Sequence, residues 1–261
     1  MKLSMQLAAA CAAFAGLAAS ALTVTGPNVL GLEKIAAAEG EQRYFPLSVS
    51  YVQPGTGEPS TVADAVQTAT LAEGDELYVY NRESGTYAVY TLGADRQWTP
   101  QKTATLSAQG EQAELANGTD AANTRLARGY GFWIKRKDAS SQPIYLTGQV
   151  AAEAAKVAIP EGSAGKPSCS LVGVGDKDWT LNDASSVWTG AADGDQIRVL
   201  GADNAVYSFI IRKNGKWIGY TRTTDANGIS RETQDESPVL KAGTAVWYVH
   251  TGAVFDLTLP F

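Results

Sequence analysis

The chain has 261 residues, 44% of them hydrophobic, and a formal net charge of −6 at pH 7. This length and composition are sufficient for a buried core. An acidic chain without a cluster of basic residues is a poor match for nucleic acid and for anionic membrane surfaces, so we expect neither as a partner.

Residues 1–21 have the features of a secretory signal peptide. Lys2 follows the first methionine, Leu7–Ala19 is almost entirely apolar, and Ala19-Ser20-Ala21 matches a signal-peptidase site. The apolar run is shorter than the roughly 20 residues that a transmembrane helix needs, and no second run of that length follows. We therefore expect cleavage before Leu22, no transmembrane segment afterwards, and export to the periplasm, the outer surface or the extracellular space.

The two cysteines bear on how the exported chain is held together. Cys11 lies within the expected signal peptide, and Ala8-Ala9-Ala10-Cys11 loosely resembles a lipobox, so a lipidated N-terminus stays open beside simple cleavage. Simple cleavage removes Lys2 and no acidic residue, which takes the net charge from −6 to −7. It leaves Cys169 alone, so no disulfide forms within the chain and the fold depends on its core.

The remaining chain predicts an all-β fold. Short runs rich in Tyr, Val, Ile, Phe and Trp are separated by Gly, Asn, Asp and Pro, as is typical of strands and turns. The Asn214-Gly215 pair is the strongest hairpin signal, because a type I′ turn needs two residues that tolerate positive φ. One or two helical turns are expected at Val62–Thr68 and at Ala151–Lys156. The predicted strands are Glu76–Tyr80, Thr86–Leu92, Gly131–Lys135, Ile144–Thr147, Gln196–Leu200, Val206–Arg212, Ala245–His250 and Val254–Leu259.

An internal repeat divides the chain into two modules. The sequence from Gly74 to Tyr80 returns from Gly194 to Leu200, and the sequence from Leu126 to Trp133 returns from Leu240 to Trp247. Such self-similarity indicates a repeated structural unit. We predict two tandem β-modules, residues 22–143 and 144–261, each a small β-barrel or β-sandwich, packed head to tail.

Each module also has a Gly-Asp-x-[LI]-x-V strand, a Tyr-containing strand and a Trp, followed by a polar loop and a Gly-x-[GA]-[FV]-Trp strand. With Gly129-Tyr130-Gly131-Phe132-Trp133-Ile134 and Ile144–Gln149, this order resembles a group of uncharacterised exported proteins of Verrucomicrobia-like and Lentisphaera-like bacteria. The resemblance covers most of the exported chain and implies the tandem β architecture. The group has no assigned activity, so the resemblance implies no functional residue.

Comparison of the two copies separates residues of the core from candidates for function. Leu77 and Val79 return as Ile197 and Val199, so alternation along the strand buries these positions and exposes Tyr78. The tryptophans that recur, Trp98 with Trp217 and Trp133 with Trp247, are expected in the cores. Some aromatic residues do not recur, and an exposed set of these would form a stacking surface for ligands, whereas scattered packing is the alternative. The candidate ligand-binding residues are Tyr78, Tyr80, Tyr130, Trp179 and Trp188.

Residues for catalysis or metal binding are few. A Ser-His-Asp triad would have to use His250, which is the one histidine. Cys169 has no basic neighbour to lower its pKa and is expected to be a small buried residue. Asp176, Asp178 and Asp183 form an oxygen-rich segment that suits calcium, although a solvated acidic turn has the same composition. We expect no other cofactor.

These features favour an exported, non-catalytic binding, adhesion or surface-structural protein. A polysaccharide or a cell-surface protein is the expected partner. A carboxylate-dependent enzyme acting on glycans and a subunit of a larger surface assembly are the alternatives.

Overall fold

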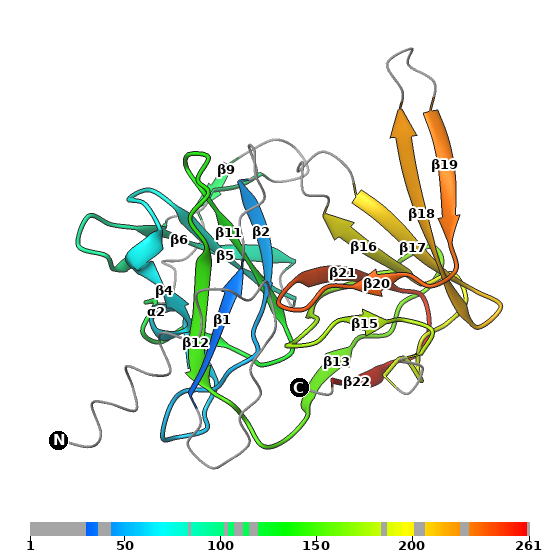
Figure 1. The fold of residues 1–261 in the computed structure, drawn as a ribbon, viewed down its shortest axis with the longest axis horizontal. Helices are drawn as coiled ribbons and strands as arrows, with labels where there is room; N and C mark the ends of the chain where they lie inside the picture. Colours follow the sequence, from blue (N-terminus) through cyan, green and yellow to red (C-terminus); the bar gives the residue numbers. More distant parts are fainter. Residues whose placement is uncertain are drawn as a thin grey trace.

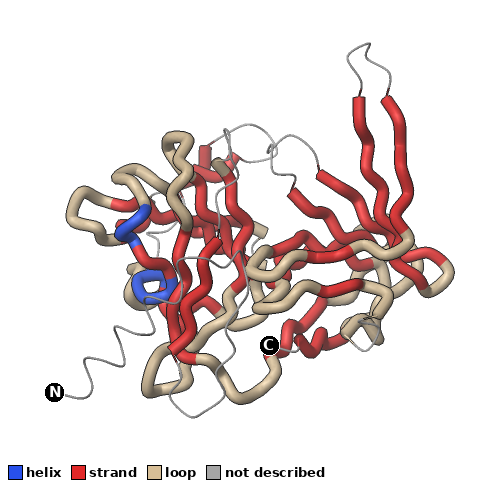
Figure 2. The backbone as a smooth tube through the Cα atoms, in the orientation of Figure 1, coloured by secondary structure: helices blue, strands red, loops and turns tan. Residues whose placement is uncertain are grey.

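The structure is a computed structural model, and it describes residues 30–35, 43–82, 85–101, 104–106, 112–114, 120–183, 187–200, 207–224 and 230–259. The expected signal peptide, residues 1–21, lies outside these ranges. Strands make up most of the described chain and helix is confined to short turns (Figure 2), which confirms the predicted all-β class. No helix among the described residues has both the length and the apolar character that crossing a membrane requires.

The first module contains a five-stranded antiparallel sheet in the order β2-β11-β5-β6-β7 (Figure 1). Its strands are β2 (Tyr44–Ser48), β11 (Gly131–Lys135), β5 (Glu76–Asn81), β6 (Thr86–Leu92) and β7 (Trp98–Pro100). A second sheet has the order β1-β12-β4, from β1 (Leu30–Ile35), β12 (Ile144–Gln149) and β4 (Val66–Gln67). The short pairs are β3 (Ser60–Thr61) with β10 (Arg125–Leu126) and β8 (Ala104–Leu106) with β9 (Gln112–Glu114).

The core of this module lies between the two larger sheets. Leu77 and Phe132 contribute to it from the five-stranded sheet, and Ile144 and Leu146 contribute from the other. A single helical turn, α2 (Val62–Ala65), adds Val62, and a 3-10 turn, η1 (Thr68–Thr70), follows β4. The helical turn predicted near Val62 is therefore present.

The second module contains a six-stranded sheet in the order β14-β21-β16-β17-β18-β19. Its strands are β14 (Ser168–Gly173), β21 (Ala245–His250), β16 (Gln196–Leu200), β17 (Tyr207–Lys213), β18 (Lys216–Thr224) and β19 (Ser230–Asp235). Two further pairs are β13 (Ala155–Ile159) with β22 (Phe255–Leu259) and β15 (Trp179–Thr180) with β20 (Val239–Leu240). The β18–β19 ribbon projects from the body of the molecule (Figure 1).

The two modules share one hydrogen-bonding order, which supports the tandem repeat. β2, β11, β5, β6 and β7 have the same neighbours as β14, β21, β16, β17 and β18. β12, which the predicted boundary at 143/144 assigns to the second module, pairs with β1 and β4 of the first. A boundary after Gln149 keeps each sheet within one module.

None of the described sheets closes on itself, so the barrel alternative is wrong and two facing sheets enclose the first core.

The local predictions have mixed outcomes. Asn214 and Gly215 have φ values of 52° and 73°, and Lys213 pairs with Lys216, as the predicted two-residue hairpin requires. The second predicted helix is wrong, because residues 151–154 form a loop and Ala155 begins β13. The backbone N–H and C=O groups of β13 form hydrogen bonds with β22, so they are not available for the hydrogen bonds of a helix.

The repeated Gly-Asp pair has a structural role. The Asp75 carboxylate accepts hydrogen bonds from the amides of Ala72 and Lys137, each at 2.9 Å. The Asp195 carboxylate accepts the equivalent bonds from the amides of Ala192 and Thr251, each at 2.8 Å. In both modules the carboxylate of a buried aspartate therefore connects two segments by hydrogen bonds. One is the turn before its own strand, β5 or β16, and the other follows the neighbouring strand, β11 or β21.

The modules face each other about an approximate two-fold axis. Leu47 on β2 forms a bridge with Thr244, which precedes β21, and Val172 on β14 forms the reciprocal bridge with Tyr130, which precedes β11. The amide of Ser48 donates to the Gly243 carbonyl at 2.9 Å, and that of Gly173 donates to the Gly129 carbonyl at 2.8 Å. This reciprocity defines an isologous interface. The expected head-to-tail packing is therefore wrong.

The paired tryptophans divide between two environments. Trp98 and Trp217 are 4% and 1% exposed and belong to the cores, as predicted. Trp133 and Trp247 are only half-buried on the outer faces of β11 and β21, and the Trp247 ring meets Tyr80 of the other module at 4.8 Å. For these two the core prediction is wrong, and Trp247 packs between the modules instead.

Candidate functional site

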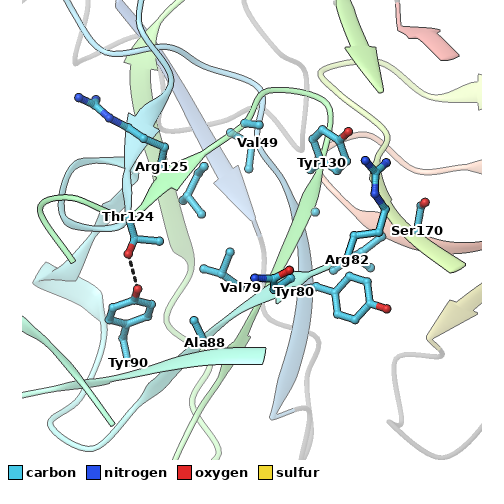
Figure 3. Close-up of a pocket in the computed structure, with 15 residues that line it drawn as sticks. Val49, Val79, Tyr80, Arg82, Ala88, Tyr90, Thr124, Arg125, Tyr130 and Ser170 are labelled. Atoms are coloured by element: carbon cyan, nitrogen blue, oxygen red, sulfur yellow. Dashed lines mark hydrogen bonds between the residues drawn. The ribbon is translucent and has the colours of Figure 1, made fainter. Parts of the chain in front are cut away.

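A cavity of about 560 Å³ lies where the first module meets β14 of the second. Its lining comes from β5 and β6, from the segment that leads into β11, and from β14 (Figure 3). The lining residues are Val49, Val79, Tyr80, Asn81, Arg82, Ala88, Tyr90, Thr124, Arg125, Leu126, Ala127, Tyr130, Gly131, Ser170 and Leu171.

One wall of the cavity belongs to the main sheet of the first module. Val79 on β5 pairs directly with Ala88 on β6, so both small apolar side chains lie on the same face of the sheet. Tyr90 follows two residues along β6 on that face, and its hydroxyl forms a hydrogen bond with the Thr124 hydroxyl (Figure 3). The wall is therefore apolar, with a fixed polar contact at one end.

The opposite wall depends on the module interface. Gly131 begins β11, and a Cβ atom there would lie 2.4 Å from the Ala245 Cβ and 2.8 Å from the Leu171 Cγ. Only glycine permits this approach, because contacts below 3.0 Å require a shift of the neighbouring atoms. The close approach brings Leu171 of β14 against the cavity.

Two predicted ligand-binding residues, Tyr80 and Tyr130, lie in this cavity. Tyr80 is half-buried near the end of β5, where its ring contacts Tyr87 at 5.3 Å and Trp247 at 4.8 Å. Burial raises the pKa of Tyr80, so its hydroxyl keeps its proton near neutral pH. Neither the Tyr80 nor the Tyr130 hydroxyl has a hydrogen-bond partner among the described residues. Both are therefore available to a ligand.

Arg82 joins the two modules at the edge of the same cavity. Its Nη1 donates a hydrogen bond to the Ala158 carbonyl on β13, and its Cζ lies 6.0 Å from the centroid of the Tyr130 ring. Figure 3 shows Arg82 beside Tyr80 and Tyr130, on the side of the cavity that faces Ser170. The guanidinium thus places a positive charge next to the two tyrosines.

The other predicted aromatic residues are not part of the cavity lining. Tyr78 is half-buried, donates a hydrogen bond to Glu76 at 2.6 Å and contacts the Tyr87 ring at 5.9 Å. Burial and the neighbouring Glu76 raise the pKa of Tyr78. Trp179 and Trp188 are 5% and 1% exposed, so their assignment to a stacking surface is wrong. They pack in the second core because large aromatic surface is stabilised by burial.

The three aspartates of the predicted calcium segment have different surroundings. Asp178 binds Lys241 Nζ at 2.8 Å and the Ala242 amide at 2.9 Å, which lowers its pKa. Asp176 lies near the module interface, where its charge acts on Glu33 and Tyr51. Within the described ranges, no three His, Cys, Asp or Glu residues form a group that could hold a metal ion. The calcium site at Asp176, Asp178 and Asp183 stays a prediction.

His250 and Cys169 are the residues that a nucleophilic active site of this chain would have to use. His250 is fully buried, with Nδ1 at 2.8 Å from Asp195 Oδ2 and Nε2 at 2.8 Å from the Ala253 carbonyl. Both ring nitrogens are occupied by structural contacts, so His250 serves the core. Cys169 is exposed on β14, and its predicted burial is wrong because its side chain is on the outer face of an end strand of the sheet.

Comparisons with known protein families, with curated proteins and with solved structures find no significant match. The site therefore has to be interpreted from its own geometry.

Sequence reasoning missed several of the residues that line the cavity. Arg82 lies between the predicted strands Glu76–Tyr80 and Thr86–Leu92, and the sequence gives no sign that its side chain reaches Ala158 of the other module. Thr124 and Leu171 come together with β5 only through the two-fold packing of the modules. The difference between the repeats at Tyr80 and Tyr130 was the one sequence signal that pointed to this place.

Proposed function

We propose that this protein is an exported, non-catalytic binding protein whose ligand is a glycan held in the cavity at the module junction. The observation that carries the proposal is the pairing of Tyr80 and Tyr130 around one cavity, each with an unpartnered hydroxyl among the described residues. Among the described residues, Trp179 and Trp188 also contact each other, but they do so inside the second core, whereas Tyr80 and Tyr130 line a cavity.

The chemistry of the lining fits a sugar. A sugar ring has apolar C–H faces that pack on aromatic rings and hydroxyl groups that need hydrogen-bond partners. Val79, Ala88 and Leu126 offer apolar surface, and the two tyrosines add rings and hydroxyls. Ligand sites typically combine a mostly apolar lining with a few polar groups that fix orientation. The volume of about 560 Å³ lies within the range of small-ligand sites.

Calorimetric titration against a panel of oligosaccharides tests the proposal. We expect one or more members to bind, and Tyr80→Ala combined with Tyr130→Ala to weaken binding about 10-fold or more, which corresponds to about 1.4 kcal/mol. Tyr145→Ala is the matched control, because Tyr145 is half-buried on β12 and does not line the cavity. Its affinity should equal that of the unmodified protein.

The same panel is screened for hydrolysis. Turnover that is abolished by a single Asp→Asn or Glu→Gln change would replace the binding function with a glycan-active enzyme. The absence of binding to every saccharide, with the chain folded, would contradict the proposal. Export is tested separately by the mass of the protein recovered from outside the cytoplasm, which should begin at Leu22.

A further inference from the structure

The charged residues among the described lining of the cavity have one sign. Arg82 and Arg125 are the charged residues among these fifteen, and none of the fifteen is Asp or Glu. The whole chain, in contrast, has 27 acidic residues against 21 basic ones. A concave site of one sign attracts ligands of the opposite sign, since its walls focus the local field.

Arg82 retains binding capacity for an anion. It contacts the Ala158 carbonyl, which is a neutral acceptor, and no ion pair links it to any carboxylate among the described residues. A guanidinium has five N–H donors in a fixed plane and matches a carboxylate in a two-point contact. The hydrogen bond to Ala158 holds that plane beside Tyr130 and leaves other donors for a ligand.

Arg125 supplies a second positive charge on the far side of the cavity from Arg82 (Figure 3). Its Nη1 lies 3.1 Å from Gln53 Oε1 and 3.0 Å from the Pro59 carbonyl, and both acceptors are neutral. Its side chain is exposed and turns outward at the rim. A chain-like ligand that leaves the cavity on this side would pass close to it.

The uncharged polar groups favour the same kind of ligand. The hydroxyls of Tyr80 and Tyr130 can donate hydrogen bonds to a carboxylate, and none of the fifteen described lining residues is an acid that would repel one. An anionic ligand therefore fits this set of described residues better than a neutral sugar does. We propose that the cavity binds an acidic saccharide, with a sugar carboxylate paired to Arg82 and the chain continuing past Arg125. This inference rests on the glycan-binding function proposed above.

Titration with oligogalacturonate, its methyl-esterified form and a neutral oligogalactose of equal length tests the inference. We expect the acidic oligomer to bind at least 10-fold more tightly than the other two, and its affinity to fall as salt is raised. Methyl esterification removes the carboxylate charge and leaves the protein unchanged, so this comparison does not depend on the folding of any variant.

Arg82→Gln should weaken binding of the acidic oligomer about 10-fold and reduce any binding of the neutral oligomer by a much smaller factor, because only the acidic oligomer loses a charged contact. Arg96→Gln is the matched control, because Arg96 donates to the Leu71 carbonyl at 2.6 Å and does not line the cavity. Equal affinity for acidic and neutral oligomers would overturn the charge inference and leave the glycan-binding proposal standing. Binding of no saccharide would overturn both proposals.

Discussion

The buried network around Asp195 makes a sharp prediction about stability. Asp195 is fully buried, and its carboxylate accepts hydrogen bonds from Tyr248 Oη at 2.5 Å, from His250 Nδ1 at 2.8 Å and from Thr251 Oγ1 at 3.0 Å. It also accepts the two amide bonds described above. Burial alone would raise the pKa of Asp195, but these bonds outweigh burial and hold the pKa below its ordinary value.

Asp195→Asn replaces an acceptor of five hydrogen bonds with an amide that has two donors of its own. Hydrogen bonds to a charged group contribute about 1.5–3 kcal/mol each, and breaking a buried charged contact costs about 3–5 kcal/mol. We therefore expect a loss of about 4 kcal/mol in the free energy of unfolding. Urea unfolding followed by tryptophan fluorescence measures it, because Trp188 and Trp217 lie 5.1 and 6.4 Å from the Tyr248 ring.

Asp75→Asn is the matched control in the first module. Asp75 is 1% exposed, and the hydrogen bonds found for its carboxylate come from two backbone amides, so we expect a loss of about 2 kcal/mol in the free energy of unfolding.

The stability that Asp195 contributes also depends on pH. Because the pKa of Asp195 is lowered in the folded state, this stabilisation is present above the unfolded-state pKa near 3.9 and is lost as pH falls through the folded-state pKa. Equal losses for the two variants, or a D195N chain that keeps the acid sensitivity of the unmodified protein, would refute this reasoning.

Two further predictions concern the first module. Leu77→Ala should lose about 3 kcal/mol because Leu77 is fully buried, whereas Tyr78→Phe on the other face should change the stability by less than about 1 kcal/mol; equal melting shifts would contradict the face assignment. Burial raises the pKa of Glu33 to about 7, although a hydrogen bond from Ser50 opposes the shift. The folded state therefore binds the proton more tightly than the unfolded state, and the protein should lose about 2 kcal/mol as pH rises from about 4.5 to 7. Glu33→Gln should remove this loss, and parallel melting curves against pH for the two proteins would show that Glu33 is not its source.

Much of the β-structure was predictable because it follows from local patterns. The runs Thr86–Leu92, Gly131–Lys135 and Ala245–His250 form strands with the predicted bounds. Alternation also gave the correct inner face, since Leu77 and Ile197 are fully buried and Val199 packs against the second core. These features depend on residues close in sequence, where side-chain direction repeats every two positions.

The errors have a common physical cause in contacts between distant residues. Trp188 lacks a counterpart in the first module and was therefore a candidate for function, yet it packs against Trp217 at 5.3 Å in the second core. The boundary after Pro143 separated β12 from its partner β1, which lies more than 100 residues earlier in the chain. Recurrence identifies equivalent positions, but it does not distinguish a core from an interface between repeats, as Trp247 demonstrates.

The two-fold arrangement explains why a site on this molecule need not occur twice. An isologous interface places the same strands on both sides, so positions at the junction have equivalent positions related by the axis. The residues at the counterpart positions differ, because Leu200 replaces Tyr80 and Thr244 replaces Tyr130 in the aligned sequences. The backbone hydrogen bonds from the Ser48 and Gly173 amides connect the two modules and are related to each other by the two-fold axis. The tyrosines are not needed for those backbone contacts. The ligand binding proposed for the junction therefore requires the two tyrosines on one side of the axis alone, and it is independent of the backbone contacts that position the modules.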